Sequence, residues 1–211
     1  MNFSPDSRFF AFCTRLVELV KINLLWMLCC LPLFTVGAAT TAMLTCVYAF
    51  RDGEDCGSRV FFRAFRKHFG KATMLWLLIA FFGAMLALDY AIVAYLEFPG
   101  RMAVIVLIAF LALSLVLVSG MIFPLVSQFP GKIKEMVINV ILLCLANLPK
   151  MLLVTAMNLL PVLLFLILPQ AFFFAGFLLI LCGFSLMALY DITVIEKIFA
   201  PFRPEEGSSK G

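Results

Sequence analysis

Few residues of this chain carry side chains that could do covalent chemistry, and none stands in a familiar catalytic pattern. His68 is the single histidine, and it lies among lysines and arginines with no nucleophile spaced to use it. The patterns GxSxG, HExxH and GxxxxGK[ST] do not occur. The sequence therefore predicts no enzyme activity, no catalytic residue and no cofactor, and an intramembrane enzyme is the least favoured class of function.

The cysteines are the next candidates for chemistry, because thiolates bind metals and form disulfides. Seven of them are spread along the chain, at positions 13, 29, 30, 46, 56, 144 and 182. They form no CxxC pair, and no histidine stands at a metal-ligand spacing from them. We interpret them as small packing residues and predict no metal site.

Two aspartates, Asp89 and Asp191, lie in apolar surroundings. An ionisable side chain within a membrane span is by default a functional candidate. With a rise of about 1.5 Å per helical residue, Asp89 falls near the outer end of its helix and Asp191 near the cytoplasmic end of another. The two are therefore not expected to act together, and Asp89 is expected to reach either headgroup water or a separate cleft.

The elements that must position these residues are membrane helices. Hydrophobic residues make up 64% of the chain and charged residues 13%, which is outside the range of soluble domains. A span needs roughly 20 apolar residues, and uncharged runs recur at 22–50, 72–88, 102–131, 136–149 and 151–190. No signal-peptide pattern precedes them. The sequence predicts an all-α, polytopic transmembrane helical bundle in which residues 1–211 form a single membrane domain.

The distribution of basic residues predicts the number of crossings. If 22–50 crossed only once, the basic loop 51–71 would face the side opposite a basic N-terminal segment, against the positive-inside rule. We therefore predict a turn inside 22–50 and six spans, paired as three hairpins with both termini cytoplasmic. Of the sixteen lysines and arginines, only Arg101 then lies outside. The predicted spans are about 11–33, 36–50, 73–96, 102–126, 151–168 and 171–194.

Two segments outside the spans are predicted separately. Residues 134–148 form an apolar stretch that is short for a crossing, and we interpret it as a cytoplasmic-side elbow or re-entrant helix. Whether it spans the membrane, re-enters it or lies on it stays open. The tail, 200–211, is predicted to be disordered.

The turn of the first hairpin has the sequence LPLFTVGAATTAM, residues 31–43. Pro32 ends one helix and Gly37 begins the next, and small residues spaced four apart allow helices to approach closely in lipid. The alternative is a broken helix that lines a solute path, with the hydroxyls of Thr40 and Thr41 beside the break. Asn158, in the fifth predicted span, is a further candidate for such a path.

Residues 59–71 have the pattern of an interfacial helix, which would be an elbow on the cytoplasmic side. Phenylalanines gather on one face and basic residues on the other, a composition typical of a helix held by the anionic inner leaflet. Nucleic acid is not expected as a partner, because the phenylalanine face would then be left in water. The basic residues are candidates for a lipid surface and for the docking of a cytoplasmic partner: Arg59, Arg63, Arg66, Lys67 and Lys71.

Several stretches of residues 20–75 together resemble the YesL-type family of bacterial integral membrane proteins. They are Asn23-Leu24-Leu25-Trp26, Leu31-Pro32, Thr35-Val36-Gly37-Ala38, Arg51-Asp52-Gly53-Glu54, Phe61-Phe62-Arg63-Ala64-Phe65, Phe69 and Lys71-Ala72-Thr73. Beyond them the resemblance is only in hydropathy. It implies a multi-pass protein of the bacterial cytoplasmic membrane with no established biochemical activity. It also implies genes that tend to lie beside those for carbohydrate ABC transporters and glycan-degrading enzymes.

Two main classes of function follow. The first is a non-catalytic membrane accessory protein that is associated with carbohydrate uptake, through the assembly or regulation of an ABC-type sugar transporter. Its partners would be anionic lipids and ABC transporter subunits, and its oligomeric state is not predicted. The second is a small solute carrier or channel, which the broken helix at 31–43 and Asn158 favour.

Overall fold

The computed structural model describes residues 5–54, 56–129, 131–167, 176 and 183–199, and all regular elements among them are helical. This confirms the all-α class. The helices are α1 (Pro5–Cys30), the 3₁₀ turn η1 (Leu33–Thr35), α2 (Val36–Arg51), α3 (Ser58–Tyr95), α4 (Arg101–Gln128), α5 (Ile133–Ala146), α6 (Leu148–Ile167) and α8 (Phe184–Phe199).

Three segments are long and apolar enough to cross a membrane by length and composition: 33–51, 58–95 and 101–128. The bent pair of α5 and α6 gives a fourth if it is counted as one span. Apolar helices of this kind indicate association with a membrane. The prediction of six spans in three hairpins is not confirmed among the described residues.

Two of the predicted spans show why. The helix predicted at 11–33 forms, as α1, but Arg15, Glu18 and Lys21 interrupt its apolar run. The last span, predicted at 171–194, is described only in part, because residues 171–175 and 177–182 lie outside the described residues. Residues 169 and 170, between the spans predicted at 151–168 and 171–194, and the tail 200–211 also lie outside them.

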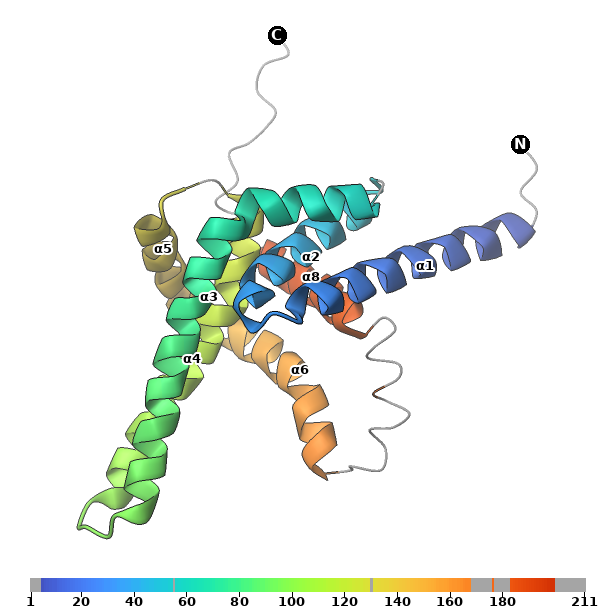
Figure 1. Cartoon of the computed structure of the whole chain (residues 1–211). Coiled ribbons are helices and arrows are strands. Elements are labelled where there is room, and N and C mark those ends of the chain that lie inside the picture. The colour runs from blue at the N-terminus through green and yellow to red at the C-terminus, as the bar shows by residue number, and fades with distance from the viewer. Residues whose placement is uncertain (1–4, 55, 130, 168–175, 177–182, 200–211) are drawn as a thin grey trace.

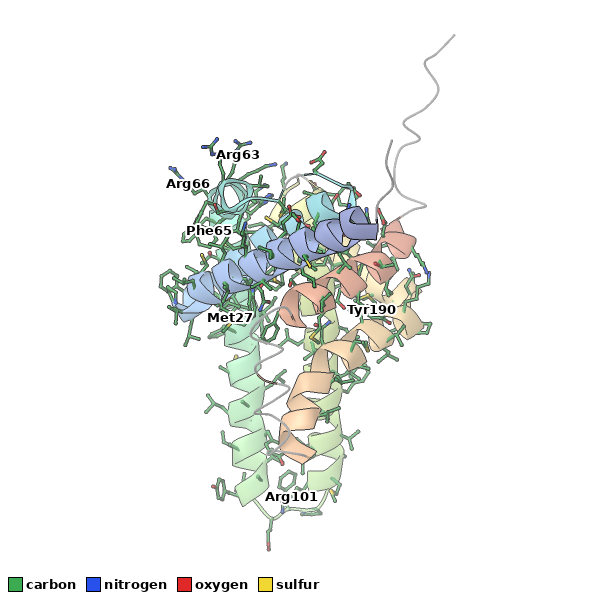
Figure 2. The ribbon with its side chains drawn as sticks, turned by 90° about the vertical axis from the view of Figure 1, so that its right-hand side faces the viewer. Met27, Arg63, Phe65, Arg66, Arg101 and Tyr190 are labelled. Atoms are coloured by element: carbon green, nitrogen blue, oxygen red, sulfur yellow. The ribbon has the colours of Figure 1, made fainter. Side chains whose placement is uncertain are left out.

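α4 and most of α3 form a long hairpin, as Figure 1 shows. The turn that closes the hairpin contains Gly100, which has a φ of 98°. The first part of α3 lies across the opposite end of this hairpin, so the helix changes direction along its length. α1 and α8 also lie obliquely across the hairpin axis in both views (Figures 1 and 2). The prediction of spans lying side by side therefore does not describe α1 and α8.

α2 is the central element of the fold. It contacts α1, α3, α4 and α8, and most of its side chains are buried. Ala38, Ala39 and Ala42 are fully buried, because their small side chains let neighbouring helices approach the α2 backbone. α2 begins at Val36, the first residue of the predicted helix 36–50, and ends at Arg51, one residue beyond the predicted end. The sequence therefore located this element well.

The short helix predicted at 134–148 forms as α5 and meets α6 at an angle of 100°. α5 ends at Ala146, and the backbone N–H of Asn147 donates to the Leu143 carbonyl at 3.1 Å. Pro149 lies in the first turn of α6, where a missing N–H costs no helical hydrogen bond. The bend therefore lies at Asn147, two residues before Pro149.

Candidate functional site

A polar cavity of about 270 Å³ lies between α1, α2, α4, α6 and α8. Most of its lining is apolar, but it also contains hydroxyl, amide and carboxylate groups. These polar lining residues are Thr40, Ser119, Thr155, Asn158 and Asp191. Because they come from α2, α4, α6 and α8, only the folded arrangement of helices brings them together.

Asp191 and Asn158 form the polar centre of this cavity. The side-chain amide of Asn158 donates to Asp191 Oδ2 at 2.8 Å and to the Val154 carbonyl at 3.0 Å. The other carboxylate oxygen, Asp191 Oδ1, is buried and has no hydrogen-bond partner among the described residues. A buried acceptor without a donor is costly, so this oxygen is the feature of the cavity that most calls for a ligand.

Aromatic rings from α1 and α8 form another part of the lining. The rings of Trp26 and Phe184 lie with their centroids 4.8 Å apart, tilted by 40°. The indole N–H of Trp26 donates to Thr40 Oγ1 at 3.2 Å. This bond uses an acceptor of the threonine and leaves its hydroxyl proton able to donate elsewhere.

The structure thus brings together two of the residues that were predicted for a solute path, Thr40 and Asn158. Thr41 is not part of the cavity: it is fully buried and donates to the Gly37 carbonyl at 2.8 Å, within its own helix. Pro32 is exposed in the bend before α2, where its carbonyl accepts the backbone N–H of Thr35 at 2.9 Å. For these two residues a structural role accounts for the sequence pattern.

Gly37 has a packing role that its surroundings define closely. A Cβ atom at this position would lie 2.4 Å from the carbonyl oxygen of Ala72 and 2.6 Å from Trp76 Cβ. Both distances are far below van der Waals contact, so only glycine allows α2 to cross α3 here. The Trp76 indole N–H also donates to the Leu33 carbonyl at 2.7 Å and fastens α3 to the turn before α2.

Asp89 lies outside the polar cavity, on the exposed surface of α3. Asp191 lies on α8 and lines the cavity. The prediction that the two aspartates do not act together agrees with this placement. Of the two candidates, Asp89 is exposed, and Asp191 has the buried carboxylate oxygen.

A second candidate site is the basic surface on the first part of α3, formed by Arg59, Arg63, Arg66 and Lys67. All four side chains are exposed, and none of them has an ion-pair partner among the described residues. In Figure 2, Arg63 and Arg66 point away from the rest of the molecule, and Arg101 lies at the opposite end of the hairpin.

Lys71, the fifth predicted basic residue, differs from the others. Its ammonium group donates to the carbonyl of Gly131 at 2.9 Å. This bond joins α3 to the segment that connects α4 and α5. Lys71 therefore connects elements within the protein, and we do not count it in the basic surface.

The phenylalanine side of this segment also divides into two parts. Phe61 is fully buried and belongs to the protein core. Phe62 and Phe69 are 46% and 39% exposed, and Phe65 packs against Phe69 with 5.4 Å between ring centroids. Part of the aromatic face that was predicted to lie on the membrane therefore belongs to the protein core, and only the exposed rings could contact lipid.

The sequence patterns did not reveal two polar contacts that join distant parts of the chain. Arg51 forms an ion pair with Glu196, 145 residues away, and its guanidinium also lies over the Tyr48 ring at 5.5 Å. Asn23 Oδ1 accepts the backbone N–H of Ser185 at 3.2 Å. A signal was present for Asn23, which lies on an apolar helix within a family motif, but its partner could not be read from spacing.

The comparisons with known proteins agree with the motifs. Residues 19–90 match the family described as "Protein of unknown function, DUF624". The chain is 32% identical over 129 residues to the "Uncharacterized protein YesL" of Bacillus subtilis (strain 168). That alignment covers 59% of this chain and 60% of the relative's length. No solved structure matches the chain. The matched stretch contains Gly37, Ala72, Trp26 and Arg51, whose contacts are described above, and through it the chain is similar to the YesL-type family.

Proposed function

We propose that this chain is a non-catalytic integral membrane accessory protein that docks a subunit of an ABC-type sugar transporter through its basic surface. The observation that carries the proposal is the exposure of Arg59, Arg63, Arg66 and Lys67 without ion-pair partners among the described residues. Four cations on one exposed face attract an acidic partner, and complementary charge raises both the rate and the specificity of such an encounter.

The proposed orientation places the basic surface on the cytoplasmic side of the bacterial cytoplasmic membrane. Arg63 and Arg66 lie at one end of the molecule and Arg101 at the other (Figure 2). The positive-inside rule favours the end with more basic residues as the cytoplasmic one. A multi-pass arrangement with both termini cytoplasmic is part of the same proposal.

Anionic lipid is the second partner of this surface. Each basic residue near an anionic leaflet contributes about 1 kcal/mol of attraction, which salt weakens. The exposed rings of Phe62 and Phe69 lie on the same helical segment and can enter the interface. A role for lipid and a role in docking predict different results when the charges are removed, because only docking needs a partner protein.

The connection with sugar uptake rests on the family resemblance. The relative that the chain matches has no described function, and the chain aligns with 60% of its length. Carbohydrate transport is thus a proposal for this chain on the grounds that the resemblance implies.

The test is co-purification of transporter permease and nucleotide-binding subunits with the tagged chain in mild detergent. We expect the triple variant Arg63→Gln, Arg66→Gln, Lys67→Gln to insert normally and to lose these subunits. The matched control is Lys132→Gln with Lys134→Gln, which removes two exposed basic residues outside the basic surface. An unchanged set of subunits with the triple variant would reject docking and leave lipid binding as the role of the surface.

A small solute carrier is the second candidate function, and the polar cavity favours it. Carriers bind their substrates within the membrane at places where polar groups face a cavity. The test is uptake of solute into liposomes by the purified chain alone, without transporter subunits. Uptake that depends on the chain would support a carrier, and its absence would leave the accessory role.

A further inference from the structure

The polar cavity contains one negative charge that no basic lining residue among the described residues balances. Asp191 is the single charged residue among the described residues that line it. No lysine, arginine or histidine of the described chain lines the cavity to balance this carboxylate. Asn158 satisfies only Oδ2, and Oδ1 stays without a donor. A carboxylate in this situation is stabilised by a ligand that brings both positive charge and N–H donors.

A second acceptor on the cavity comes from α4. Pro124 lies inside this helix and has no backbone N–H, so the carbonyl of Gly120, four residues earlier, lacks its usual helical donor. Both Gly120 and Pro124 line the cavity. A backbone carbonyl freed in this way is a typical partner for a cation within a membrane protein.

The rest of the lining sets the size and polarity of the ligand. The volume of about 270 Å³ lies just below the range of about 300–1,000 Å³ that holds drug-sized ligands. The paired rings of Trp26 and Phe184 offer aromatic faces, which attract cations. Met43, Met187 and Val154 add apolar surface, so the ligand has a short apolar body.

We propose that the polar cavity binds a small organic cation with a primary ammonium group, which donates to Asp191 Oδ1 and to the Gly120 carbonyl. A primary ammonium has three donors and one charge, which suits two open acceptors and one carboxylate. A divalent metal fits less well, since no group of three His, Cys, Asp or Glu residues occurs among the described residues. The proposal deepens the carrier candidate by naming its ligand class, and it does not depend on docking.

The experiment uses Trp26 as the reporter of binding. The chain has two tryptophans, and Trp76→Phe leaves Trp26 as the single one. The purified full-length chain is titrated with n-butylammonium chloride, with n-butanol as the uncharged analogue and with sodium chloride as the inorganic cation. We expect a saturable change in Trp26 fluorescence with n-butylammonium alone. Binding without uptake into liposomes would support the site and reject the carrier.

Variants locate the response. Asp191→Asn keeps the shape of the side chain and its contact with Asn158 but removes the charge, and we expect binding to weaken by about tenfold to a hundredfold. Asp89→Asn removes an exposed aspartate outside the cavity and should leave the affinity unchanged. A Cβ added at Gly120 meets no atom within 4 Å, so the protein can accommodate a larger side chain there. Because Gly120 lines the cavity, the leucine of Gly120→Leu should fill the space of the ligand and abolish binding.

Several results would overturn the proposal. They are no saturable response to n-butylammonium, an equal response to n-butanol, or an equal response to sodium, which would assign the cavity to an inorganic cation. An unchanged affinity in Asp191→Asn would do the same. If Asp191→Asn does not fold, Gly120→Leu decides, because wild-type affinity in that variant would place the ligand elsewhere.

Discussion

Gly37 and Gly53 both belong to the motifs that carry the family resemblance, but they are required for different physical reasons. Gly37 is needed because of its neighbours, since the α3 backbone at Ala72 occupies the space of a side chain. Gly53 has no atom near its would-be Cβ and is needed because of its own backbone, with a φ of 81°. Two glycines that look alike in the sequence therefore predict different mutational behaviour.

The first prediction concerns Gly37→Ala. We expect a loss of about 1–3 kcal/mol in stability, because the new methyl group would force α2 and α3 apart. The measurement is the apparent melting temperature in mild detergent, followed by size exclusion after heating. Ala39→Leu is not suitable as a control variant, because Ala39 is fully buried. An unchanged melting temperature for Gly37→Ala would show that the two helices do not cross this closely.

The second prediction concerns the end of α2. Glu54 N–H donates to the Ala49 carbonyl at 2.9 Å and Gly53 N–H to Phe50 at 3.2 Å, the two bonds of a Schellman motif with glycine in the left-handed region. Gly53→Ala should cost about 1–2 kcal/mol from backbone strain alone.

Gly70→Ala is the matched control for this prediction. It lies inside α3 with nothing within 4 Å of an added Cβ, and it should stabilise the protein by about 1 kcal/mol through helix propensity. Shifts of the melting temperature in opposite directions would confirm both assignments. A stabilising Gly53→Ala would contradict the left-handed conformation.

Between elements, the ion pair of Arg51 and Glu196 fastens α2 to the last described helix. The guanidinium binds both carboxylate oxygens, at 2.9 Å from Nη2 to Oε1, and it also contacts Asp52 at 3.0 Å. The two paired side chains are about three-quarters buried, at 27% and 28% exposure. Such a pair is partly screened by solvent, so its contribution is moderate.

The third prediction is that Glu196→Gln lowers stability by about 1 kcal/mol and that high salt reduces the difference from wild type. Asp52→Asn is the control, since Asp52 is 57% exposed and should change stability by less than about 0.5 kcal/mol. Thermal unfolding at low and high salt measures both. Equal effects of the two variants would show that the contact with α8 adds nothing beyond local charge.

The limits of α2, α4, α5 and α6 were predictable to within a few residues, but the continuity of α3 through 58–95 and the arrangement of the helices were not. The start of α2 at Val36 and the limits of α4 follow from Pro32, Gly37, Gly100 and the apolar runs. The oblique packing of α8 depends on contacts such as Asn23 with Ser185, which periodicity cannot reveal. Thr40 and Asn158 were identified one by one, but Asp191 was given little weight because its depth, and not its neighbours, was all that the sequence supplied.

For the molecule as a whole, the α3–α4 hairpin presents a large apolar surface. The most hydrophobic stretches of these two helices have almost no residue buried within the protein. An exposed apolar surface of this extent is unstable in water, so lipid or another apolar partner must cover it. This surface is the strongest physical indication of a membrane protein in the structure.

The fourth prediction is topological. A reporter inserted at Gly57, just before the basic surface, and one fused after Gly211 should both report the cytoplasmic side. The physical reason is the attraction of the basic residues of α3 to the inner side of the membrane. A third reporter, inserted next to Gly100 in the turn of the hairpin, should report the outside. Gly57 and Gly100 on the same side would contradict the crossing of the hairpin.

The position of α2 at the centre of the fold has a consequence for synthesis. α2 leaves the ribosome early, but its partner α8 follows only after more than a hundred further residues. Until then Arg51 lacks Glu196, and Thr40 faces a cavity that α8 has yet to close. A nascent chain that stalls before residue 184 therefore lacks the contacts that α8 provides to these polar groups.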